Sequence, residues 1–270
     1  MKRYSGIQPQ YFPRLHYFAR IMATDIFMVR DDVQFVRHHK YPDGTNGFSY
    51  QAHSPIKSSM EIYYLVIPIA HEGLTPIFKT HISDREKWTS SHVQTIKSVY
   101  GKAPNFEKIF PQIKSIIEGK HESLLELNLK TILWGVLNLL GEKEIKDDML
   151  SLDSVNQKLS QKHDFRLKEI RLATSLKSFK NFTNQTANEK ILSILKELGA
   201  TEDYCGGTAM SAYVDESLFE KEGIKITVQD WKCQKYPQLF EDKLGFIPNL
   251  SIIDLLMNVD HKKAVEIING

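Results

Sequence analysis

Three polar side chains, Asp31, Asp32 and Gln34, follow directly after a short apolar run at residues 26–29. Such a run predicts a buried strand, and ligands of open α/β sheets bind at the carboxyl ends of the strands. A carboxylate placed there can act as a general base or as a metal ligand. Because adjacent strand residues point to opposite faces, Asp31 and Asp32 can serve one site only if the strand has already ended. The alternative is that both aspartates cap the following turn.

A second candidate lies earlier in the chain, where Gln8 is followed by prolines and aromatic rings at residues 9–13, Tyr11 among them. We expect a strand at residues 3–9 and a helix at residues 13–23. The free N–H groups at a helix start, and the positive end of its dipole, suit a phosphate or a carboxylate. The Gln8 amide could add a contact. A proline–aromatic cluster that only fixes a loop explains these residues equally well.

Two further signals are weaker. His92 shares an apolar face with Trp88 on a helix expected at residues 84–100, where a lone histidine is more often a packing residue than a catalytic one. Gly206 and Gly207 could bring the backbone close to a phosphate or a pantetheine, although no P-loop or Gly-x-Gly-x-x-Gly motif is present. The preceding Cys205 is more typical of a core residue than of a nucleophile. No set of histidines, cysteines and carboxylates has metal-ligand spacing, so no metal site is predicted.

The composition, with 41% hydrophobic and 25% charged residues among 270, is that of a folded protein. We expect a single unit over residues 1–270, with a possible subdivision into 1–142 and 143–270. A net charge of +2 gives no support to a nucleic-acid partner. No apolar run is long enough for a transmembrane segment. Two distant cysteines, and no sign of a targeting peptide, predict a cytoplasmic protein with reduced thiols and leave the oligomeric state open.

Strand-like and helix-like patterns alternate along the rest of the chain. Strands are expected at residues 63–69, 145–154, 203–208 and 224–231. Helices are expected at residues 105–118, 122–140, 188–198, 216–222, 250–259 and 262–268, with Pro111 a possible break in the first of these. Asp-Gly and Asn-Gly pairs within residues 42–47 predict the tip of a hairpin or loop. The pattern indicates an α/β fold, with a mostly parallel sheet flanked by helices and a helical insertion in the middle of the chain.

The order and spacing of several short motifs resemble the WbqC-like protein family over nearly the whole chain. These motifs include Gln8-Pro9-x-Tyr11-Phe12-Pro13, Asp31-Asp32-Val33-Gln34-Phe35, Pro55-Ile56-Lys57, Tyr213-x-Asp215-Glu216, Tyr236-Pro237-Gln238 and Ile247-Pro248-x-Leu250-Ser251. At four positions the chain departs from residues that are frequent in the family, namely Ile7, His53, Met210 and Ser211. These departures suggest a subgroup with its own substrate.

The resemblance implies a role in O-antigen or other surface-polysaccharide biosynthesis, since genes for such proteins typically lie in these clusters. It favours an acyl or aminoacyl transferase, or an ATP-dependent ligase, acting on a nucleotide-linked amino sugar. The implied partners are that nucleotide-activated sugar and an acyl or aminoacyl donor. The donor is either made with ATP and Mg²⁺ or supplied as a thioester, so no cofactor is fixed. The alternatives are a non-catalytic ligand-binding or scaffold protein of glycan assembly and a nucleotidyltransferase-like enzyme.

Within that interpretation Asp31 or Asp32 is the base, and His92 is the second choice. Gln8 and Lys57 would donate hydrogen bonds to an oxyanion or a phosphate. The expected substrate-binding residues are Gln8, Tyr11, Gln34, Lys57, Gly206, Gly207, Tyr213, Gln238, Asn249 and Ser251. The first and last thirds of the chain are therefore expected to build one site together.

Overall fold

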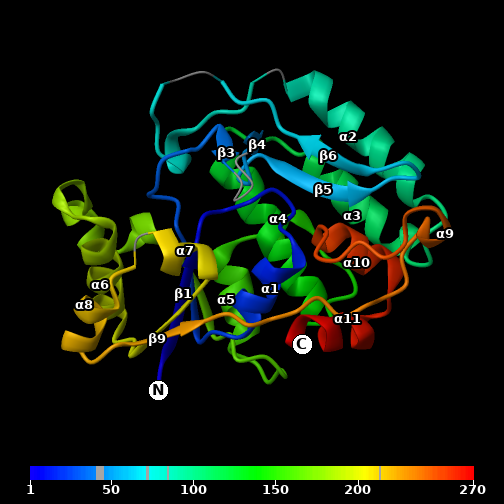
Figure 1. The fold of residues 1–270 in the computed structure, drawn as a ribbon. Coiled ribbons are helices and arrows are strands. Elements are labelled where there is room, and N and C mark those ends of the chain that lie inside the picture. Colours follow the sequence, from blue (N-terminus) through cyan, green and yellow to red (C-terminus); the bar gives the residue numbers. More distant parts are fainter. Residues whose placement is uncertain (41–45, 71–72, 84, 213) are drawn as a thin grey trace.

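A five-stranded parallel sheet runs through the centre of the molecule (Figure 1). The computed structural model describes residues 1–40, 46–70, 73–83, 85–212 and 214–270. The strand order is β7-β2-β1-β8-β9, and every neighbouring pair is parallel. The strands are β1 Arg3–Ile7, β2 Ile26–Val29, β7 Glu169–Leu172, β8 Glu202–Cys205 and β9 Lys225–Val228. The α/β fold with a parallel sheet is thereby confirmed.

Successive residues of β2 point into two different apolar cores. Phe27 and Val29 belong to the larger core, whereas Ile26 and Met28 belong to the smaller one. An uninterrupted apolar strand of this kind is typical of a parallel sheet that is covered on both faces. The apolar run in the sequence therefore reflects burial from two sides.

Helices cover both faces of the sheet, and Figure 1 shows α6 and α8 on one side and α1, α10 and α11 on the other. Helices that contribute to the larger core include α1 Leu15–Met22, α5 Leu152–Leu159, α10 Ile252–Asn258 and α11 His261–Asn269. The smaller core is closed by η4 Lys177–Asn184, α6 Ala187–Leu198 and α8 Glu216–Lys221. Within the described ranges, no helix has both the length and the apolar character needed to cross a bilayer.

The helical insertion in the middle of the chain is confirmed. It consists of α2 Arg85–Tyr100, α3 Phe106–Glu118 and α4 Leu124–Leu139. Pro111 lies inside α3 and does not break it. The remaining short elements are η1 Ile77–Lys79, η2 Asp147–Met149, η3 Ala173–Ser175, α7 Gly207–Ala212 and α9 Glu241–Leu244.

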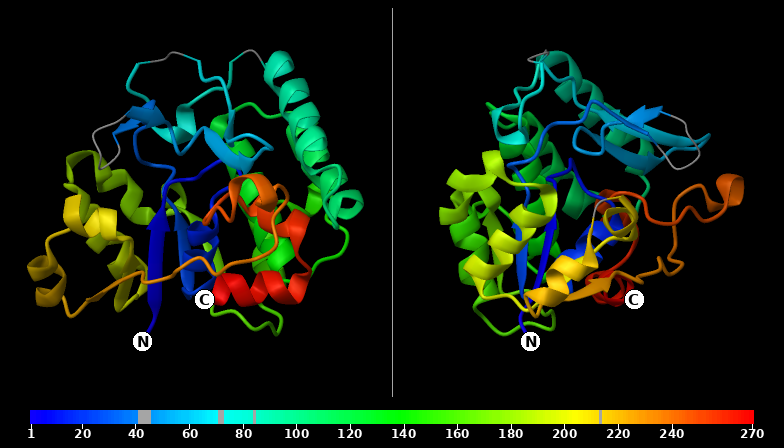
Figure 2. Two further views of the ribbon diagram at one scale, coloured as in Figure 1. Left: turned by 45° about the vertical axis from the view of Figure 1, so that its right-hand side comes forward. Right: turned by 60° about the vertical axis from the view of Figure 1, so that its left-hand side comes forward.

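Two antiparallel hairpins lie above the carboxyl ends of the parallel strands, as both views in Figure 2 show. They are β3 His38–Lys40 with β4 Asn46–Phe48, and β5 His53–Lys57 with β6 Ile62–Val66. The expected turn at residues 42–47 falls between β3 and β4, but residues 41–45 lie outside the described part of the chain.

The strand expected at residues 145–154 is wrong. Those residues form η2 and the start of α5, because Ser151 caps a helix by accepting a hydrogen bond from the Ser154 N–H. The third strand of the sheet along the chain is instead β7. It has no apolar run because the charged residues Glu169 and Arg171, which form an ion pair, alternate with apolar ones. Its free edge is closed by the Asn156 amide, which bonds to the N–H and the C=O of Ile170 at 2.8 and 2.9 Å.

The packing of α4 on α1 makes a prediction about a buried glycine. A side chain at Gly135 would overlap the Phe18 ring. We expect Gly135→Ala to lower the free energy of unfolding by about 1–3 kcal/mol, because overpacking outweighs the gain in helix propensity of about 1 kcal/mol. Urea denaturation followed by circular dichroism measures this change.

Gly207→Ala is the matched control, since a side chain there would meet nothing closer than the Val228 Cγ1 at 4.0 Å. The control should unfold at the same urea concentration as the original protein, or at a slightly higher one. Equal destabilisation by both substitutions would contradict the close packing of α1 against α4.

Candidate active site at the carboxyl ends of β1 and β8

Strands β1 and β8 stop pairing with each other part of the way along their length. Their pairing ends at Tyr4 and Asp203, although β1 continues to Ile7 beside β2 and β8 continues to Cys205 beside β9. From β1 the chain adds β2 and β7 on one side, and from β8 it adds β9 on the other. The strand order therefore reverses between β1 and β8. Open α/β sheets bind ligands at the carboxyl ends of the strands at such a switch point. The candidate site therefore lies at the upper ends of β1 and β8.

Asp203 is a buried carboxyl at this point. Its side chain is 3% exposed, and no hydrogen bond to it is found among the described residues. Burial raises the pKa of Asp203 from 3.8 to about 7, against the opposing effect of Arg20 and Arg30. Asp203 therefore changes charge close to neutral pH, which is what a general base requires.

A second buried aspartate, Asp254, shows what a structural carboxyl looks like in this fold. It accepts hydrogen bonds from the Tyr100 hydroxyl at 2.9 Å, the Tyr236 hydroxyl at 2.8 Å and the Gln238 amide at 3.0 Å. Burial raises the pKa of Asp254 to about 6. Both carboxyls are desolvated, but only Asp254 has the hydrogen bonds that normally accompany burial. Asp203 is thus a buried carboxyl without the hydrogen bonds that hold Asp254 among the described residues.

Arg30 and Gly6 form one wall of the site. The Arg30 guanidinium holds Asp32 with two bonds, from Nε to Oδ1 at 2.7 Å and from Nη2 to Oδ2 at 2.9 Å. A side chain at Gly6 would collide with the Tyr4 hydroxyl and would lie 3.2 Å from the Arg30 Cγ. The Tyr4 hydroxyl is buried without an acceptor in the described part of the chain. Glycine is therefore needed here to admit both side chains.

Arg20 approaches from the opposite direction, on α1. Its Nε and Nη2 both donate to the Gln229 Oε1, at 2.9 and 2.7 Å. A side chain at Gly206 would lie 2.6 Å from the Arg20 Nη2, so the guanidinium packs directly on the turn that follows β8. Arg20 and Arg30 thus bring two guanidinium groups to this end of the sheet, where they can bind an anionic ligand.

The predicted glycines and Gln8 lie at the same end of the sheet. Gly206 and Gly207 follow β8 directly, and Gln8 follows β1. Gln8 is partly exposed, and its side-chain amide takes part in no hydrogen bond that the structure shows between described residues. These three residues, proposed from the sequence as substrate contacts, therefore lie at the same end of the sheet, beyond the level of Asp203.

Asp31 is engaged elsewhere. Its carboxylate accepts hydrogen bonds from the Thr174 N–H at 3.1 Å and from the Thr174 hydroxyl at 2.5 Å, and burial raises its pKa. It thus ties the end of β2 to the turn after β7, as the capping alternative describes. Because the oxygens of Asp31 and Asp32 are already engaged, the pair does not fit a Mg²⁺ site. In the described ranges, no three His, Cys, Asp or Glu residues are grouped as metal ligands.

Lys57 and Gln238 belong to the network around Asp254. The Gln238 Oε1 accepts from the Lys57 Nζ at 3.3 Å and from the Ile247 N–H at 2.9 Å, and its Nε2 donates to the Ile247 C=O at 2.8 Å. The Lys57 Nζ also donates to the Gly245 C=O. Both side chains are buried, and none of these hydrogen-bond partners is Asp203, Arg20 or Arg30. Their hydrogen bonds hold the segment before α10 in place.

Asn249 and Ser251 lie at the start of α1. The Asn249 Oδ1 accepts from the His16 N–H at 3.0 Å, and the Leu250 C=O accepts from the Leu15 N–H at 3.1 Å. The Ser251 hydroxyl donates to the Phe12 C=O at 2.9 Å. The two ends of the chain do meet here, but the N–H groups expected to bind an anion are already taken by protein oxygens.

The other predicted residues are dispersed. The Tyr11 hydroxyl lies 3.2 Å from the His92 Nδ1, and both side chains are buried. Burial lowers the pKa of His92 to about 4, so this histidine is neutral and packs against Trp88. Gln34 is exposed on the segment that pairs with Pro76. Tyr213 lies outside the described residues.

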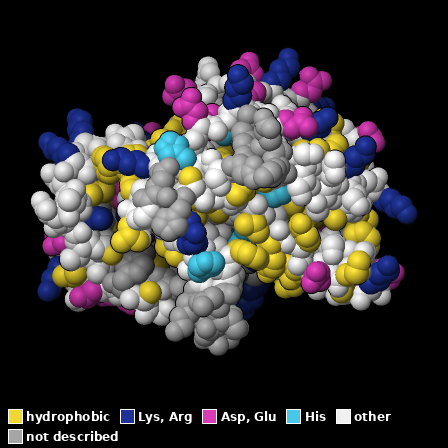
Figure 3. All heavy atoms as spheres, turned by 90° about the horizontal axis from the view of Figure 1, so that it is seen from above, with side chains coloured by type: hydrophobic (Ala, Val, Ile, Leu, Met, Phe, Trp, Pro, Cys, Tyr) yellow, Lys and Arg dark blue, Asp and Glu magenta, His cyan; other side chains and the backbone are white. Residues whose placement is uncertain are grey.

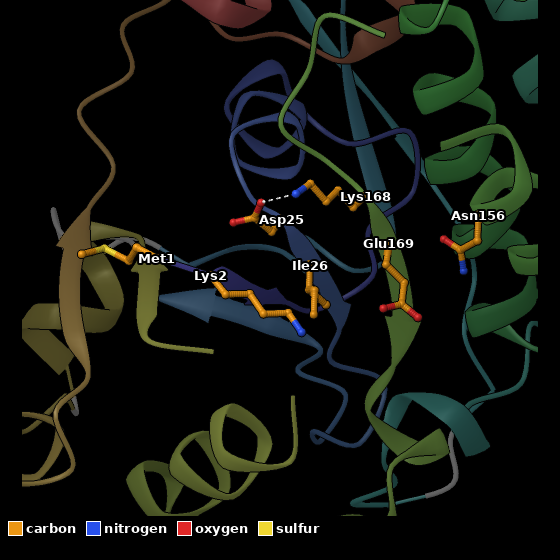
Figure 4. Close-up of a pocket in the computed structure, with 7 residues that line it drawn as sticks. All are labelled: Met1, Lys2, Asp25, Ile26, Asn156, Lys168 and Glu169. Atoms are coloured by element: carbon orange, nitrogen blue, oxygen red, sulfur yellow. Dashed lines mark ion pairs between the residues drawn. The ribbon is translucent and has the colours of Figure 1, made fainter. Parts of the chain in front are cut away.

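Figure 3 looks down on this end of the molecule, and most acidic side chains lie near its outline whereas histidines lie towards the middle. A cavity of about 570 Å³ lies at the opposite end of the sheet, at the amino ends of β1, β2 and β7 (Figure 4). Its charges are already partnered, since Asp25 pairs with Lys168 and with Arg166. The polar strand ends are therefore the better candidate.

Sequence reasoning missed Asp203, Arg20, Arg30 and Tyr4. One signal was available: Asp203 is a carboxylate inside a predicted strand at residues 203–208, which is an unfavourable position unless the strand ends there or the group has a function. Arg30 and Arg20 gave no signal, because their relation to Asp203 depends on strand order.

Comparison with known proteins agrees with the family resemblance. The model of the WbqC-like protein family matches residues 8–266. A Mycobacterium tuberculosis protein named Uncharacterized protein Rv1507c is 24% identical over 262 residues, which cover 96% of this chain and 94% of that protein. No solved structure matches the chain. Because the family model spans nearly all of the sequence, the chain belongs to the WbqC-like protein family.

Proposed function

We propose that this protein forms an amide on the amine of a nucleotide-linked amino sugar, as a step of surface-polysaccharide or glycoconjugate biosynthesis. The observation that carries the proposal is the buried Asp203 carboxyl at the switch point, with its pKa raised to about 7. A base is most effective when its pKa lies near the working pH, and a sugar ammonium must lose a proton before it can attack a carbonyl. Family membership supports the class of pathway.

The reaction can be written for a thioester donor. Asp203 accepts a proton from the sugar ammonium, and the freed amine attacks the carbonyl carbon of the donor. A C–N bond forms, the C–S bond breaks, and the thiolate leaves with the proton that the nitrogen releases. In this proposal the Gln8 amide, whose side chain makes no hydrogen bond among the described residues, donates to the developing oxyanion.

Arg20 and Arg30 supply the positive potential for the nucleotide phosphates. Arginine is well suited to this because its guanidinium stays charged and presents several donors in one plane. In the described structure each guanidinium is oriented by a partner, Gln229 for Arg20 and Asp32 for Arg30. A thioester donor is the simpler choice here, since Asp31 and Asp32 do not offer a Mg²⁺ site for an ATP-dependent step.

Replacement of Asp203 tests its assignment as the base. Asp203→Asn should reduce turnover by about 100- to 10,000-fold, because the amine can no longer lose its proton to the site. The assay is mass spectrometry of N-acylation, with UDP- and dTDP-linked amino sugars as acceptors and acetyl-coenzyme A as donor. Binding of the acceptors, measured by calorimetry, should persist in the variant.

Glu202→Gln is the matched control, because Glu202 is the neighbouring buried carboxyl and is held by Arg3 at 2.9 Å and Thr227 at 2.7 Å. This control should lower the melting temperature and leave the turnover of the folded protein unchanged. An Asp203→Asn variant with full turnover would favour a non-catalytic ligand-binding protein.

Asp31→Asn separates the two candidate bases. Because Asp31 accepts two hydrogen bonds from Thr174, we expect a loss of about 1–3 kcal/mol in the free energy of unfolding and unchanged turnover. If turnover were lost in folded Asp31→Asn but kept in Asp203→Asn, the base would be Asp31 and the assignment to Asp203 would be wrong.

The pH dependence has a definite sign. Asp203 must be ionised to accept a proton, so turnover should rise as the pH passes through about 7. A phosphate ligand favours the protonated carboxyl, so the affinity for UDP should fall over the same range. Because the folded pKa of Asp203 lies above its ordinary value of 3.8, its contribution to stability is full below that pH and is lost as the pH rises through 7.

Isothermal calorimetry with UDP and thermal denaturation, both between pH 5 and pH 9, measure these trends. Asp203→Asn should remove the change in UDP affinity near neutral pH and should be more stable than the original protein at the alkaline end. A UDP affinity with the same pH profile in both proteins would show that Asp203 does not face the phosphate site.

A further inference from the structure

A second cavity, of about 590 Å³, lies on the other side of β8 from Asp203. Tyr204 lines it, and adjacent strand residues point to opposite faces of a sheet. The small side chains of Ala19 on α1 and of Ala23 directly after it leave room beside β8 and the edge strand β9. The segment after β9 and the end of α11 line the rest of the cavity, with Trp231, Gln234 and Asn269 among their residues. Its size is within the range of roughly 300–1,000 Å³ that is usual for small-molecule sites.

Two aromatic rings in this cavity are fixed before any ligand arrives. Trp231 is half-buried, and its Nε1 donates to the Ile267 C=O at 3.1 Å. Tyr204 is also half-buried, and the Arg3 guanidinium lies over its ring, 4.9 Å from the ring centroid. Rigid aromatic surfaces bury apolar ligand faces at little cost in conformational entropy.

Several polar groups beside these rings have no hydrogen-bond partner among the described residues. None of the hydrogen bonds shown between described residues involves the Tyr204 hydroxyl or the side-chain amides of Gln234 and Asn269, which all line the cavity. The Arg3 Nε is buried and has no partner among the residues described. Hydroxyl and amide groups of this kind can both donate and accept hydrogen bonds.

The charges in this cavity are balanced, unlike those around Asp203. Arg3 is paired with Glu202 at 2.9 Å, and Lys232 lies 4.0 Å from Asp230. There is thus no excess of positive charge to hold a phosphate. The ligand that fits such a cavity is uncharged, has an apolar face, and carries several hydroxyl groups.

We propose that this cavity, bounded by Tyr204 and Trp231, binds a neutral saccharide. An apolar face of a sugar ring packs on one of the two aromatic rings, and its hydroxyl groups bond to Gln234, Asn269 and the Tyr204 hydroxyl. The site is separate from Asp203, so it does not depend on the amide-forming reaction. It gives the protein a second place, apart from Asp203, at which to hold a glycan.

Tryptophan fluorescence tests this proposal directly, because the chain has three tryptophans and the other two are buried. Trp88 is 5% exposed and Trp134 is 0% exposed, so quenching by acrylamide reports mainly on Trp231. Titration with N-acetylglucosamine, galactose and maltotriose should give a saturable change in emission for at least one sugar and should protect Trp231 from acrylamide. UDP should produce neither effect.

Tyr204→Ala retains Trp231 as the fluorescent reporter. This variant should weaken the saccharide affinity by at least about fivefold, the loss expected for one aromatic contact of about 1 kcal/mol. Tyr63→Ala, an exposed tyrosine on β6 outside this cavity, is the control and should bind as the original protein does. Asp203→Asn should also bind normally, which separates this site from the proposed reaction. The proposal is overturned if no sugar gives a saturable response at millimolar concentration, or if UDP alone protects Trp231.

Discussion

The removal of the Asp203 carboxyl from water is the constraint on which this account depends. A buried carboxyl must gain hydrogen bonds or charged neighbours, or its pKa rises until it is neutral. Asp254 in the same protein gains three hydrogen bonds, from Tyr100, Tyr236 and Gln238. Asp203 gains none in the described structure and only the more distant influence of Arg20 and Arg30. The fold therefore maintains a carboxyl whose charge is poised to change at neutral pH.

The surrounding backbone makes this arrangement possible. β1 and β8 stop pairing at Tyr4 and Asp203, so the strand ends beyond that pair are free to diverge. Gly6 leaves room for Tyr4 and Arg30, and Gly206 lets Arg20 approach the turn after β8. Without a side chain at either glycine, two guanidinium groups reach the region of one carboxyl from opposite sides of the sheet. The same strand then presents Tyr204 on its other face, where charges are paired and aromatic rings dominate.

The sequence predicted the elements whose patterns are local. The strand at residues 26–29 and the helices of the middle insertion follow from apolar runs and helical spacing. β7 was not predicted, because two of its four residues, Glu169 and Arg171, are charged and form an ion pair with each other. Its outer edge is covered by the Asn156 side chain. Nothing in the neighbouring sequence specifies that closure, which comes from a helix earlier in the chain.

The candidate site was predictable only in part, for the same reason. Its location at strand ends, near Gln8 and Gly206, follows from the alternation of strands and helices. The different roles of Asp31 and Asp32 could not be predicted, because they depend on contacts between distant or folded segments. Thr174 donates hydrogen bonds to Asp31, whereas Arg30 pairs with Asp32. Lys57 and Gln238 looked like ligand contacts because their type and nearby prolines resemble a binding loop. In the structure, however, they bond to each other and Gln238 also bonds to Asp254.

The most direct test of the central claim is the titration of Asp203 itself. Carbon-13 NMR of protein labelled at the aspartate carboxyl groups, with Asp203→Asn used to assign the signal, gives its pKa without any assumption about substrate. The account predicts a midpoint near 7 in the ligand-free protein. A midpoint near the ordinary 3.8 would mean that Asp203 is solvated or paired, and the assignment of this residue as the base would fail.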